Sequence, residues 1–308
     1  MQEKIEACAR ALTAYGVRYG DAISLCVLAM PEAVYLLYAI NKIGAIANML
    51  VMNATEAEIH EKLAVTKSKV VITVDLALEK IVQASKKTSV KHIIGVSLAE
   101  SMPCVIGTLY KWKAKIKQEN YIAFSEFLKA GQGKKIECPE IKADAPAIIA
   151  YTGGTTGKAK GVLLSNRAAN VIAFQYKYAD KVLDFQKGER FLDIIPPFLA
   201  YGLFFGVHMA LCTCLEDVLC PDPAPERLPK LFMKYKPNHL SGGPLHMEAM
   251  TKDKRIQRMN LSFAKTVAYG GDGMNQEWED AMSEFLKSHQ ASYGLMKGYG
   301  MTEMAGPV

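Results

Sequence analysis

Tyr151-Thr152-Gly153-Gly154-Thr155-Thr156-Gly157-Lys158-Ala159-Lys160-Gly161 is the most informative stretch of this sequence. It contains four glycines, three threonines and two lysines in eleven residues. Glycines allow backbone N–H groups to converge on an anion, threonine hydroxyls donate further hydrogen bonds, and lysines add positive charge. The stretch therefore predicts a loop that binds a polyphosphate. The alternative is a polar surface turn, because glycine and threonine are also common in turns.

Apolar runs flank this loop on both sides. Residues 146–150 read as a buried strand and residues 162–164 as a second strand, and Ser165-Asn166 is a good helix start. Two familiar phosphate loops fit this context badly. A Walker A loop requires glycine where Thr152 stands and Ser or Thr where Ala159 stands, and the dinucleotide fingerprint G-x-G-x-x-G is absent.

Strand and helix patterns alternate through most of the chain. The expected helices cover residues 2–15, 31–43, 55–66, 76–86, 166–178, 203–211, 226–235, 245–252 and 276–289, with helical segments in 106–130. The expected strands cover residues 22–28, 44–51, 70–74, 92–96, 191–195, 238–240 and 266–269, besides the two beside the loop. This alternation is typical of an α/β protein whose parallel sheets are covered by helices.

Composition limits the classes of function. The chain has 308 residues, half of them hydrophobic and 22% charged, which suits about two globular domains or subdomains. The formal net charge is +6. The densest basic cluster, residues 111–117, alternates lysine with apolar residues, as on a helix face or a solvated edge. We therefore expect no nucleic-acid partner, and the small positive surplus suits anionic small molecules.

The cysteines and histidines form no recognisable metal or redox motif. The seven cysteines lack disulfide, zinc and redox spacing, and none of the six histidines has metal-ligand spacing. The sequence shows no signal peptide and no apolar stretch long enough to span a bilayer. These features predict a cytoplasmic protein without a membrane span.

The loop resembles the phosphate loop of the adenylate-forming enzymes, which include acyl- and aryl-CoA synthetases, firefly-type luciferases and the adenylation domains of peptide synthetases. The family pattern reads Tyr-Thr-Ser-Gly-Thr-Thr-Gly-x-Pro-Lys-Gly, and this chain keeps eight of its ten specified positions. Gly153 replaces Ser, and Ala159 replaces Pro, which should make the loop more flexible. The segment Gly298-Tyr299-Gly300-Met301-Thr302-Glu303 resembles the family's Tyr-Gly-x-Thr-Glu.

The resemblance implies a site for ATP and Mg²⁺. The residues that would bind the phosphates are Thr152, Gly153, Gly154, Thr155, Thr156, Gly157 and Lys158. Lys160, Thr302 and Glu303 would be catalytic, with Thr302 on the α-phosphate and Glu303 as the Mg²⁺ ligand. A structural alternative for Glu303 is an exposed glutamate at a helix start.

The resemblance also implies an adenine side and an acyl side. Tyr299 would offer a flat face to adenine, although it could instead be a core tyrosine, and Gly300 would also bind the nucleotide. Gly271 and Asp272 align with a family Gly-Gly-Ala segment that borders both adenine and the acyl group, although Asp272 could simply bond its own turn. The acyl pocket would be lined by Phe198, Leu199, Tyr201 and Gly271. Plain core packing is the alternative for these apolar residues.

Three glycine-rich turns, at residues 242–243, 270–273 and 298–300, follow strand-like runs and are expected to converge on one ligand. Leu199 stands where the family often has histidine, so the resemblance does not imply a histidine-assisted step here, and the acyl pocket is expected to be more apolar. The resemblance further implies two α/β subdomains, 45–187 and 1–44 plus 188–308. The family's small C-terminal domain would be absent, so the chain is interpreted as a fragment.

The expected reaction joins a small-molecule carboxylate to coenzyme A. The carboxylate would attack the α-phosphorus of Mg-ATP, and coenzyme A would then take the acyl group from the acyl adenylate. One rival is an adenylation enzyme that loads a carrier protein. Another is a non-catalytic module that binds ATP or AMP without turnover. Aryl, medium-chain and long-chain acids all fit the sequence.

Overall fold

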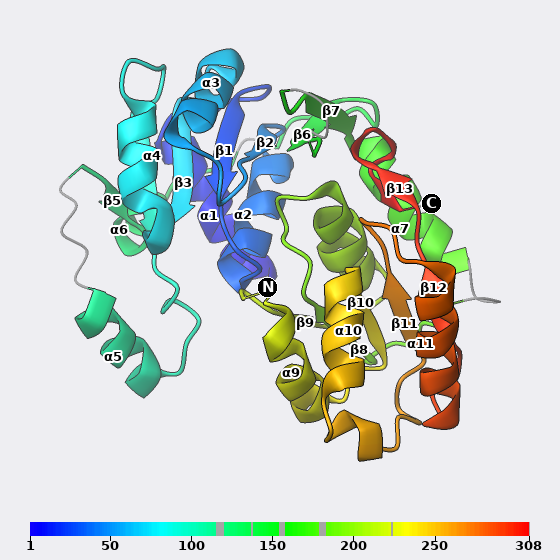
Figure 1. Ribbon diagram of the computed structural model, residues 1–308. Coiled ribbons are helices and arrows are strands. Elements are labelled where there is room, and N and C mark those ends of the chain that lie inside the picture. Colours follow the sequence, from blue (N-terminus) through cyan, green and yellow to red (C-terminus); the bar gives the residue numbers. More distant parts are fainter. Residues whose placement is uncertain (115–119, 137, 154–157, 179–182, 223, 308) are drawn as a thin grey trace. The chain divides into compact units, whose positions relative to one another are not determined.

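The computed structural model describes residues 1–114, 120–136, 138–153, 158–178, 183–222 and 224–307, and Figure 1 shows their course. The chain forms two compact units, Met1–Asn166 and Arg167–Val308. Each unit is built on its own, largely parallel sheet. This confirms the predicted fold class of two parallel-sheet α/β subdomains.

The first unit contains a seven-stranded sheet in the order β5-β4-β3-β1-β2-β6-β7. Its strands are β1 (Ala22–Cys26), β2 (Ile46–Met49), β3 (Val70–Val74), β4 (His92–Val96), β5 (Ile122–Ala123), β6 (Pro146–Tyr151) and β7 (Gly161–Ser165). All neighbours pair in parallel except β6 and β7, which are antiparallel. The fully buried run of β3 is typical of a parallel strand covered on both faces.

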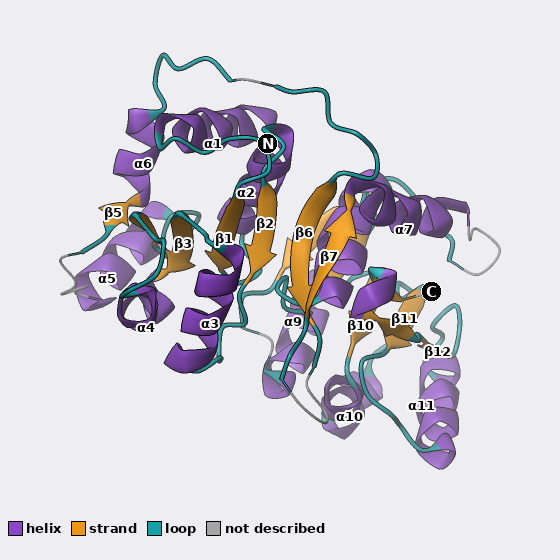
Figure 2. Cartoon of the chain, turned by 90° about the horizontal axis from the view of Figure 1, so that it is seen from above, coloured by secondary structure: helices purple, strands orange, loops and turns teal. Residues whose placement is uncertain are grey.

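Helices cover both faces of this sheet. They are α1 (Gln2–Ala14), α2 (Pro31–Lys42), α3 (Glu56–Thr66), η1 (Asp75–Ala77), α4 (Leu78–Ser85), α5 (Cys104–Ala114) and α6 (Phe124–Ala130). Figure 2 shows α1 and α6 on one side of the strands and α3 and α4 on the other. Helix α3 begins as predicted, because Thr55 and Glu58 form a capping box in which each side chain bonds the other's backbone N–H.

The division of the chain differs from the predicted subdomains. Residues 1–44 were expected to join 188–308, but β1 pairs with both β2 and β3 in the middle of the first sheet. These ladders hold residues 1–44 in the first unit. The boundary between the units lies at Asn166, not at residue 187, because the first sheet ends with β7.

The second unit contains a five-stranded parallel sheet in the order β12-β11-β10-β8-β9 and a short hairpin of β13 and β14. Its strands are β8 (Arg190–Asp193), β9 (Glu216–Leu219), β10 (His239–Gly242), β11 (Thr266–Tyr269), β12 (Leu295–Lys297), β13 (Gly300–Met301) and β14 (Gly306–Pro307). Its helices are α7 (Asn166–Tyr178), η2 (Tyr201–Met209), α8 (Ala210–Cys212), η3 (Pro225–Arg227), α9 (Leu228–Tyr235), α10 (Pro244–Lys252), η4 (Ile256–Arg258), α11 (Gln276–Ser288) and η5 (Thr302–Met304).

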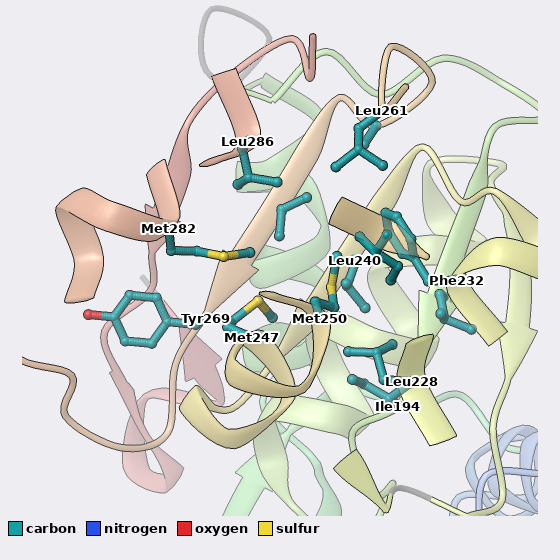
Figure 3. Close-up of a cluster of buried hydrophobic side chains, with 14 of the residues drawn as sticks. Ile194, Leu228, Phe232, Leu240, Met247, Met250, Leu261, Tyr269, Met282 and Leu286 are labelled. Atoms are coloured by element: carbon teal, nitrogen blue, oxygen red, sulfur yellow. The ribbon is translucent and has the colours of Figure 1, made fainter. Parts of the chain in front are cut away.

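Alternating side chains of the second sheet form two cores. Leu192 of β8 joins a cluster that includes Phe232, Met247 and Leu286 from α9, α10 and α11, and Figure 3 shows this cluster. The neighbouring Phe191 joins a cluster with residues of α7 and η2. Because successive strand residues point to opposite faces, the two clusters cover the two faces of β8.

The helix predicted at residues 203–211 begins earlier, at Tyr201, and its first part has the wider turns of a π-helix. Residues 201–209 form the π-helix η2, and α8 continues it. Two glycines permit its close approach to the end of β8. A Cβ at Gly202 would lie 2.4 Å from the Pro196 carbonyl oxygen, and one at Gly206 would lie 2.7 Å from Asp193 Oδ1. Across the described ranges, no helix has both the length and the apolar character needed to traverse a bilayer.

Candidate functional site

The predicted phosphate loop connects β6 and β7 in the first unit. Tyr151 pairs with Gly161, and beyond this pair the Thr152 N–H donates to the Lys160 carbonyl oxygen (3.0 Å). The Lys160 N–H donates in turn to Thr152 Oγ1 (3.1 Å). The two ends of the loop are therefore fixed to each other. The predicted phosphate ligands Gly154, Thr155, Thr156 and Gly157 lie outside the described residues.

A buried chain of polar side chains holds the base of this hairpin. The Tyr151 hydroxyl donates to Asn48 Oδ1 on β2 (2.9 Å), and Asn48 Nδ2 donates to Ser24 Oγ on β1 (2.7 Å). Ser24 is hydrogen-bonded to Ser68, which is hydrogen-bonded to Thr66. Burial raises the pKa of the Tyr151 phenol to about 12, so the phenol stays protonated and can donate this bond. We call these five residues the Tyr151 network.

A pocket of about 400 Å³ lies between α3 and the loop hairpin. Its lining includes Ile149 and Leu163 on the strands and Lys62 on α3, besides Lys158 of the loop. Lys158 forms an ion pair with Glu61 (2.9 Å), with both side chains largely exposed. The Lys62 ammonium lies 4.2 Å from the Tyr151 ring centroid, and burial lowers the pKa of Lys62. The pocket is therefore lined by Lys62 of α3 and by Lys158 of the predicted phosphate loop.

The three glycine-rich turns of the second unit lie next to one another. The Gly270 N–H donates to the Gly242 carbonyl oxygen (3.0 Å), and the Gly298 N–H donates to the Tyr269 carbonyl oxygen (2.8 Å). A Cβ at Gly270 would lie 3.0 Å from the Gly298 carbonyl oxygen. The three turns thus lie together at the carboxyl ends of β10, β11 and β12, and their convergence on one ligand stays a prediction.

Around Gly270, the predicted adenine and acyl residues differ in exposure. Tyr299 is 66% exposed, which rules out the alternative of a core tyrosine. Gly271 has φ +83°, a conformation that favours glycine, and it is exposed like Asp272. Asp272 Oδ1 accepts the Gly273 N–H (2.7 Å), so its side chain bonds its own turn.

Thr302 and Glu303 lie in the turn of the β13–β14 hairpin. Gly300 pairs with Pro307 and Met301 with Gly306, and the 3₁₀ turn η5 connects the strands. Glu303 is exposed and Thr302 is half-buried. A Cβ at Gly306 would lie 3.9 Å from Tyr201 Cα, so the hairpin packs on the start of η2.

The predicted acyl-pocket residues follow β8. Leu199 is 38% exposed, whereas Phe198 is half-buried. Tyr201 is hydrogen-bonded to Ser241 at the end of β10, and its hydroxyl oxygen would lie 3.5 Å from a Cβ at Gly270. Tyr201 and Gly270, the residue before Gly271, therefore share one edge of the second sheet.

Sequence reasoning missed a buried aspartate pair, Asp193 and Asp217, beneath η2. Asp193 is fully buried and its Oδ1 accepts the Ile195 N–H (3.2 Å). Asp217 is paired with Phe191, so both carboxyls lie on the face of the sheet that η2 covers. Burial raises the pKa of both groups, and Asp193 raises that of Asp217 further. The sequence signal for this pair was a carboxylate inside each of two short strand-length segments. A search for hydrophobic patterns does not identify such residues as buried.

Among the described residues, no three His, Cys, Asp or Glu side chains cluster as a metal site would require. His60, His239, His246 and His289 make hydrogen bonds to backbone atoms or to Glu189. A Mg²⁺ ion that needs only one or two protein carboxylates besides phosphate oxygens is compatible with the exposed Glu303.

The fold and the two motif-bearing edges define an α/β protein with glycine-rich loops at the carboxyl ends of its parallel strands. The family model of AMP-binding enzymes matches residues 1–308, and the chain belongs to this family.

A long-chain-fatty-acid–CoA ligase of Bacillus subtilis is 27% identical to this chain over 302 residues. The 4-coumarate–CoA ligase CCL1 of Humulus lupulus is 30% identical to it over 303 residues. The alignments cover 95% and 97% of this chain but only 52% and 51% of these relatives. The chain thus spans about half the length of the curated relatives it matches.

Solved structures show the same fold. The anthranilate CoA ligase AuaEII in complex with anthranoyl-AMP superimposes with a TM-score of 0.81 at 20% identity, over 97% of this chain and 54% of that one. The N-terminal domain of FACL13 from Mycobacterium tuberculosis superimposes with a TM-score of 0.77 at 19% identity, over 98% of this chain and 68% of that one.

Proposed function

We propose that this chain acts in AMP-forming ligation of a carboxylic acid to coenzyme A. The observation that carries the proposal is the presence of both motifs, residues 151–161 and 298–303, in a member of the AMP-binding enzyme family. The ligase names of the curated relatives support this class of reaction. Their acids, a long-chain fatty acid and 4-coumarate, support an aliphatic or aryl carboxylate as substrate.

In this proposal the loop of the first unit binds the β- and γ-phosphates of ATP. Lys158 and Lys160 supply charge, and backbone N–H groups of the glycines supply hydrogen bonds. The hydroxyl of Thr152 uses a lone pair to accept the Lys160 N–H, which leaves its proton for a phosphate oxygen. The Tyr151 network keeps the base of the loop fixed, so less conformational entropy is lost when phosphate binds.

The remaining parts of the nucleotide are assigned to Gly271 and to residues 299–303 in this proposal. The exposed ring of Tyr299 offers a flat face to adenine, and Gly271 carries no side chain that would keep a ligand away from the backbone of its turn. Thr302 donates to the α-phosphate. Glu303 is the ligand for Mg²⁺, which supplies charge neutralisation of the phosphates when bound.

The reaction has two steps. First, a carboxylate oxygen of the acid attacks the α-phosphorus, and the bond to pyrophosphate breaks to leave an acyl adenylate. Then the sulfur of coenzyme A attacks the acyl carbonyl carbon, the thiol proton is lost, and AMP leaves. Leu199 has no ionisable group, so the protein contributes mainly position and charge stabilisation.

The test is carboxylate-dependent release of AMP and pyrophosphate by the protein at its full natural length. Thr302→Ala removes a proposed hydrogen bond to the α-phosphate and Glu303→Ala removes the proposed Mg²⁺ ligand, and each should lower the rate by roughly a hundredfold. Glu284→Ala, which removes an exposed carboxylate of α11, is the matched control and should leave the rate unchanged. Unchanged rates in all three variants would show that the assigned residues do not act in adenylation.

The acceptor is tested separately, with coenzyme A and a phosphopantetheinylated carrier protein offered at equal concentration. Thioester formation with coenzyme A supports the ligase. A strong preference for the carrier protein would show that the carrier, and not coenzyme A, is the acceptor. The proposed adenylation step would be unaffected by this result. Nucleotide binding without any acyl adenylate would favour a non-catalytic binding module.

A further inference from the structure

The aspartate pair of the second unit supports the π-helix η2 at two places. Asp193 Oδ1 accepts the Ile195 N–H, and the Ile195 carbonyl oxygen would lie 2.6 Å from a Cβ at Gly202 in the first turn of η2. Four residues later, a Cβ at Gly206 would lie 2.7 and 2.8 Å from the two oxygens of Asp193. The carboxyl group of Asp193 therefore lies directly against the backbone of η2.

Both carboxyls of the pair lie in surroundings that disfavour a negative charge. Asp193 Oδ2 and both carboxyl oxygens of Asp217 are buried and have no hydrogen-bond partner among the described residues. Burial raises the pKa of each carboxyl, and no cation in the described part of the chain offsets this effect. A buried carboxylate without a cation or enough donors is strongly destabilised, so the folded protein holds both groups in their neutral form.

The other ionisable groups of the elements around the pair do not supply a positive charge. Burial raises the pKa of Tyr201 on η2 and of Cys220 after β9, and the charge of Asp193 raises both further. Burial also raises the pKa of Tyr176 on α7, whereas it lowers the pKa of His208 on η2. These groups are therefore neutral when the second unit is folded at neutral pH.

The start of η2 connects the pair to the predicted acyl pocket. Tyr201 is hydrogen-bonded to Ser241, which pairs with Asp193 in the ladder of β8 and β10. Paired residues of neighbouring strands point to the same face of a sheet, so Ser241 and Asp193 both face η2. The position of Tyr201 beside Gly270 thus depends on η2 staying on this face.

We propose that Asp193 and Asp217 are positioning residues that hold η2, and through it Tyr201, only while both carboxyls are protonated. When η2 moves away, water reaches the pair and each carboxyl loses its proton to water. The two negative charges then oppose the return of the helix. Because exposed aspartates release their protons above about pH 4, rising pH favours the released form of η2.

The test is hydrogen exchange of the whole chain, followed by mass spectrometry, from about pH 5 to about pH 8, a range above the pKa of an exposed aspartate. Each rate is divided by the rate of the unstructured peptide at the same pH. Protection of residues 201–212 should fall by up to about tenfold per pH unit for each carboxyl that ionises on release. Peptides of α11 report unfolding of the whole second unit, and they should stay more strongly protected at every pH.

Asp193→Asn combined with Asp217→Asn replaces both carboxyls by neutral amides of the same shape. The amide oxygen at position 193 still accepts the Ile195 N–H, so protection of residues 201–212 should no longer depend on pH. Asp217→Asn alone should remove one of the two protons from this dependence. Glu284→Gln changes an exposed carboxylate of α11 in the same way and should leave the dependence unchanged. Circular dichroism and thermal unfolding show whether each variant is folded.

Three results would overturn the proposal. Protection of residues 201–212 in the unchanged folded chain could be independent of pH, or the folded double variant could show the same dependence on pH as the unchanged chain. Protection could also fall equally in α11, which would mean that pH acts on the whole second unit and not on η2.

A consequence for catalysis rests on the proposed function. In the protein at its full natural length, release of η2 should raise KM for the acid as pH rises, and Asp193→Asn with Asp217→Asn should abolish this rise. Hydrogen exchange as predicted, without any carboxylate-dependent AMP release, would support the role of the pair and contradict the proposed function. Exchange that does not depend on pH would overturn the role of the pair alone.

Discussion

Replacing Tyr151 by phenylalanine removes one hydroxyl group from the base of the phosphate-loop hairpin. The ring that Lys62 contacts at 4.2 Å from its centroid remains. Asn48 Oδ1 loses the donor that lies 2.9 Å away, and Asn48 is 0% exposed, so water does not replace it. A buried polar atom left without its partner costs about 1–3 kcal/mol. The first unit should be destabilised by this amount.

The assay is hydrogen exchange followed by mass spectrometry, because the two units need not unfold together. Peptides that cover β2 and β6 should exchange about fivefold to a hundredfold faster in the variant, the rate equivalent of that free energy. Peptides of α11, in the second unit, serve as the internal reference and should not change.

Tyr19→Phe is the matched control, because it removes a hydroxyl from a tyrosine that is 53% exposed. A surface change of this kind should alter stability by less than about 0.5 kcal/mol. If Tyr151→Phe accelerates exchange no more than Tyr19→Phe does, the Tyr151 network does not stabilise the hairpin and the reasoning fails.

Three further predictions concern charge, pH and packing. Glu61→Gln should free Lys158 from its exposed ion pair and raise the affinity for Mg-ATP in calorimetry by at most about fivefold, the value of a surface pair; lower affinity would contradict it. Burial raises the pKa of both carboxyls of the aspartate pair, so the folded second unit holds protons that the unfolded chain releases above about pH 4, and its stability should fall as pH rises from there. Asp217→Asn should reduce this dependence of the unfolding free energy on pH by up to about 1.4 kcal/mol per pH unit, as measured by urea unfolding. An unchanged dependence on pH would refute the prediction. Gly202→Ala should destabilise the second unit by about 1–3 kcal/mol, because the added Cβ would overlap with backbone carbonyls. Gly273→Ala, where the added Cβ would have no atom within 4 Å, should have little effect, and thermal unfolding of both variants measures the difference. Equal effects would show that the backbone at Gly202 adjusts to the added methyl group.

Local signals predicted most of the elements. The capping box at Thr55 and the β-branched run of Val70–Val74 each agree with the structure to within a residue. The strand at Thr266–Tyr269 and the helix start at Asn166 were also predicted correctly. These segments carry their information in neighbouring residues, because capping and alternation depend on positions a few residues apart.

Other features depend on partners that lie far away in the sequence. The grouping of residues 1–44 with the first sheet depends on pairing of β1 with β2 and β3, and no local pattern reveals strand order. Strand β9 was missed because Glu216 and Asp217 break its apolar pattern, and burial of Asp217 follows only from the cover that η2 provides. Asn48 lay inside a segment predicted as a strand, but its bond to Tyr151 spans 103 residues.

The candidate site divides in the same way. The phosphate loop and the Tyr-Gly-x-Thr-Glu segment could be recognised from short motifs, and so could the three glycine turns. The proximity of Gly270 to Tyr201 could not, because it brings the start of η2 next to the end of β11, which is distant in sequence. The roles of the individual site residues in nucleotide binding stay predictions.

The most direct test of the account is a calorimetric titration of this chain with Mg-ATP, beside its Thr302→Ala variant. We predict saturable binding at one site, weakened roughly tenfold or more by the substitution, since a hydrogen bond to a charged phosphate contributes about 1.5–3 kcal/mol. Absence of binding by a chain shown to be folded, or equal affinity of the two proteins, would contradict the assignment of Thr302 and of a nucleotide site formed by these residues.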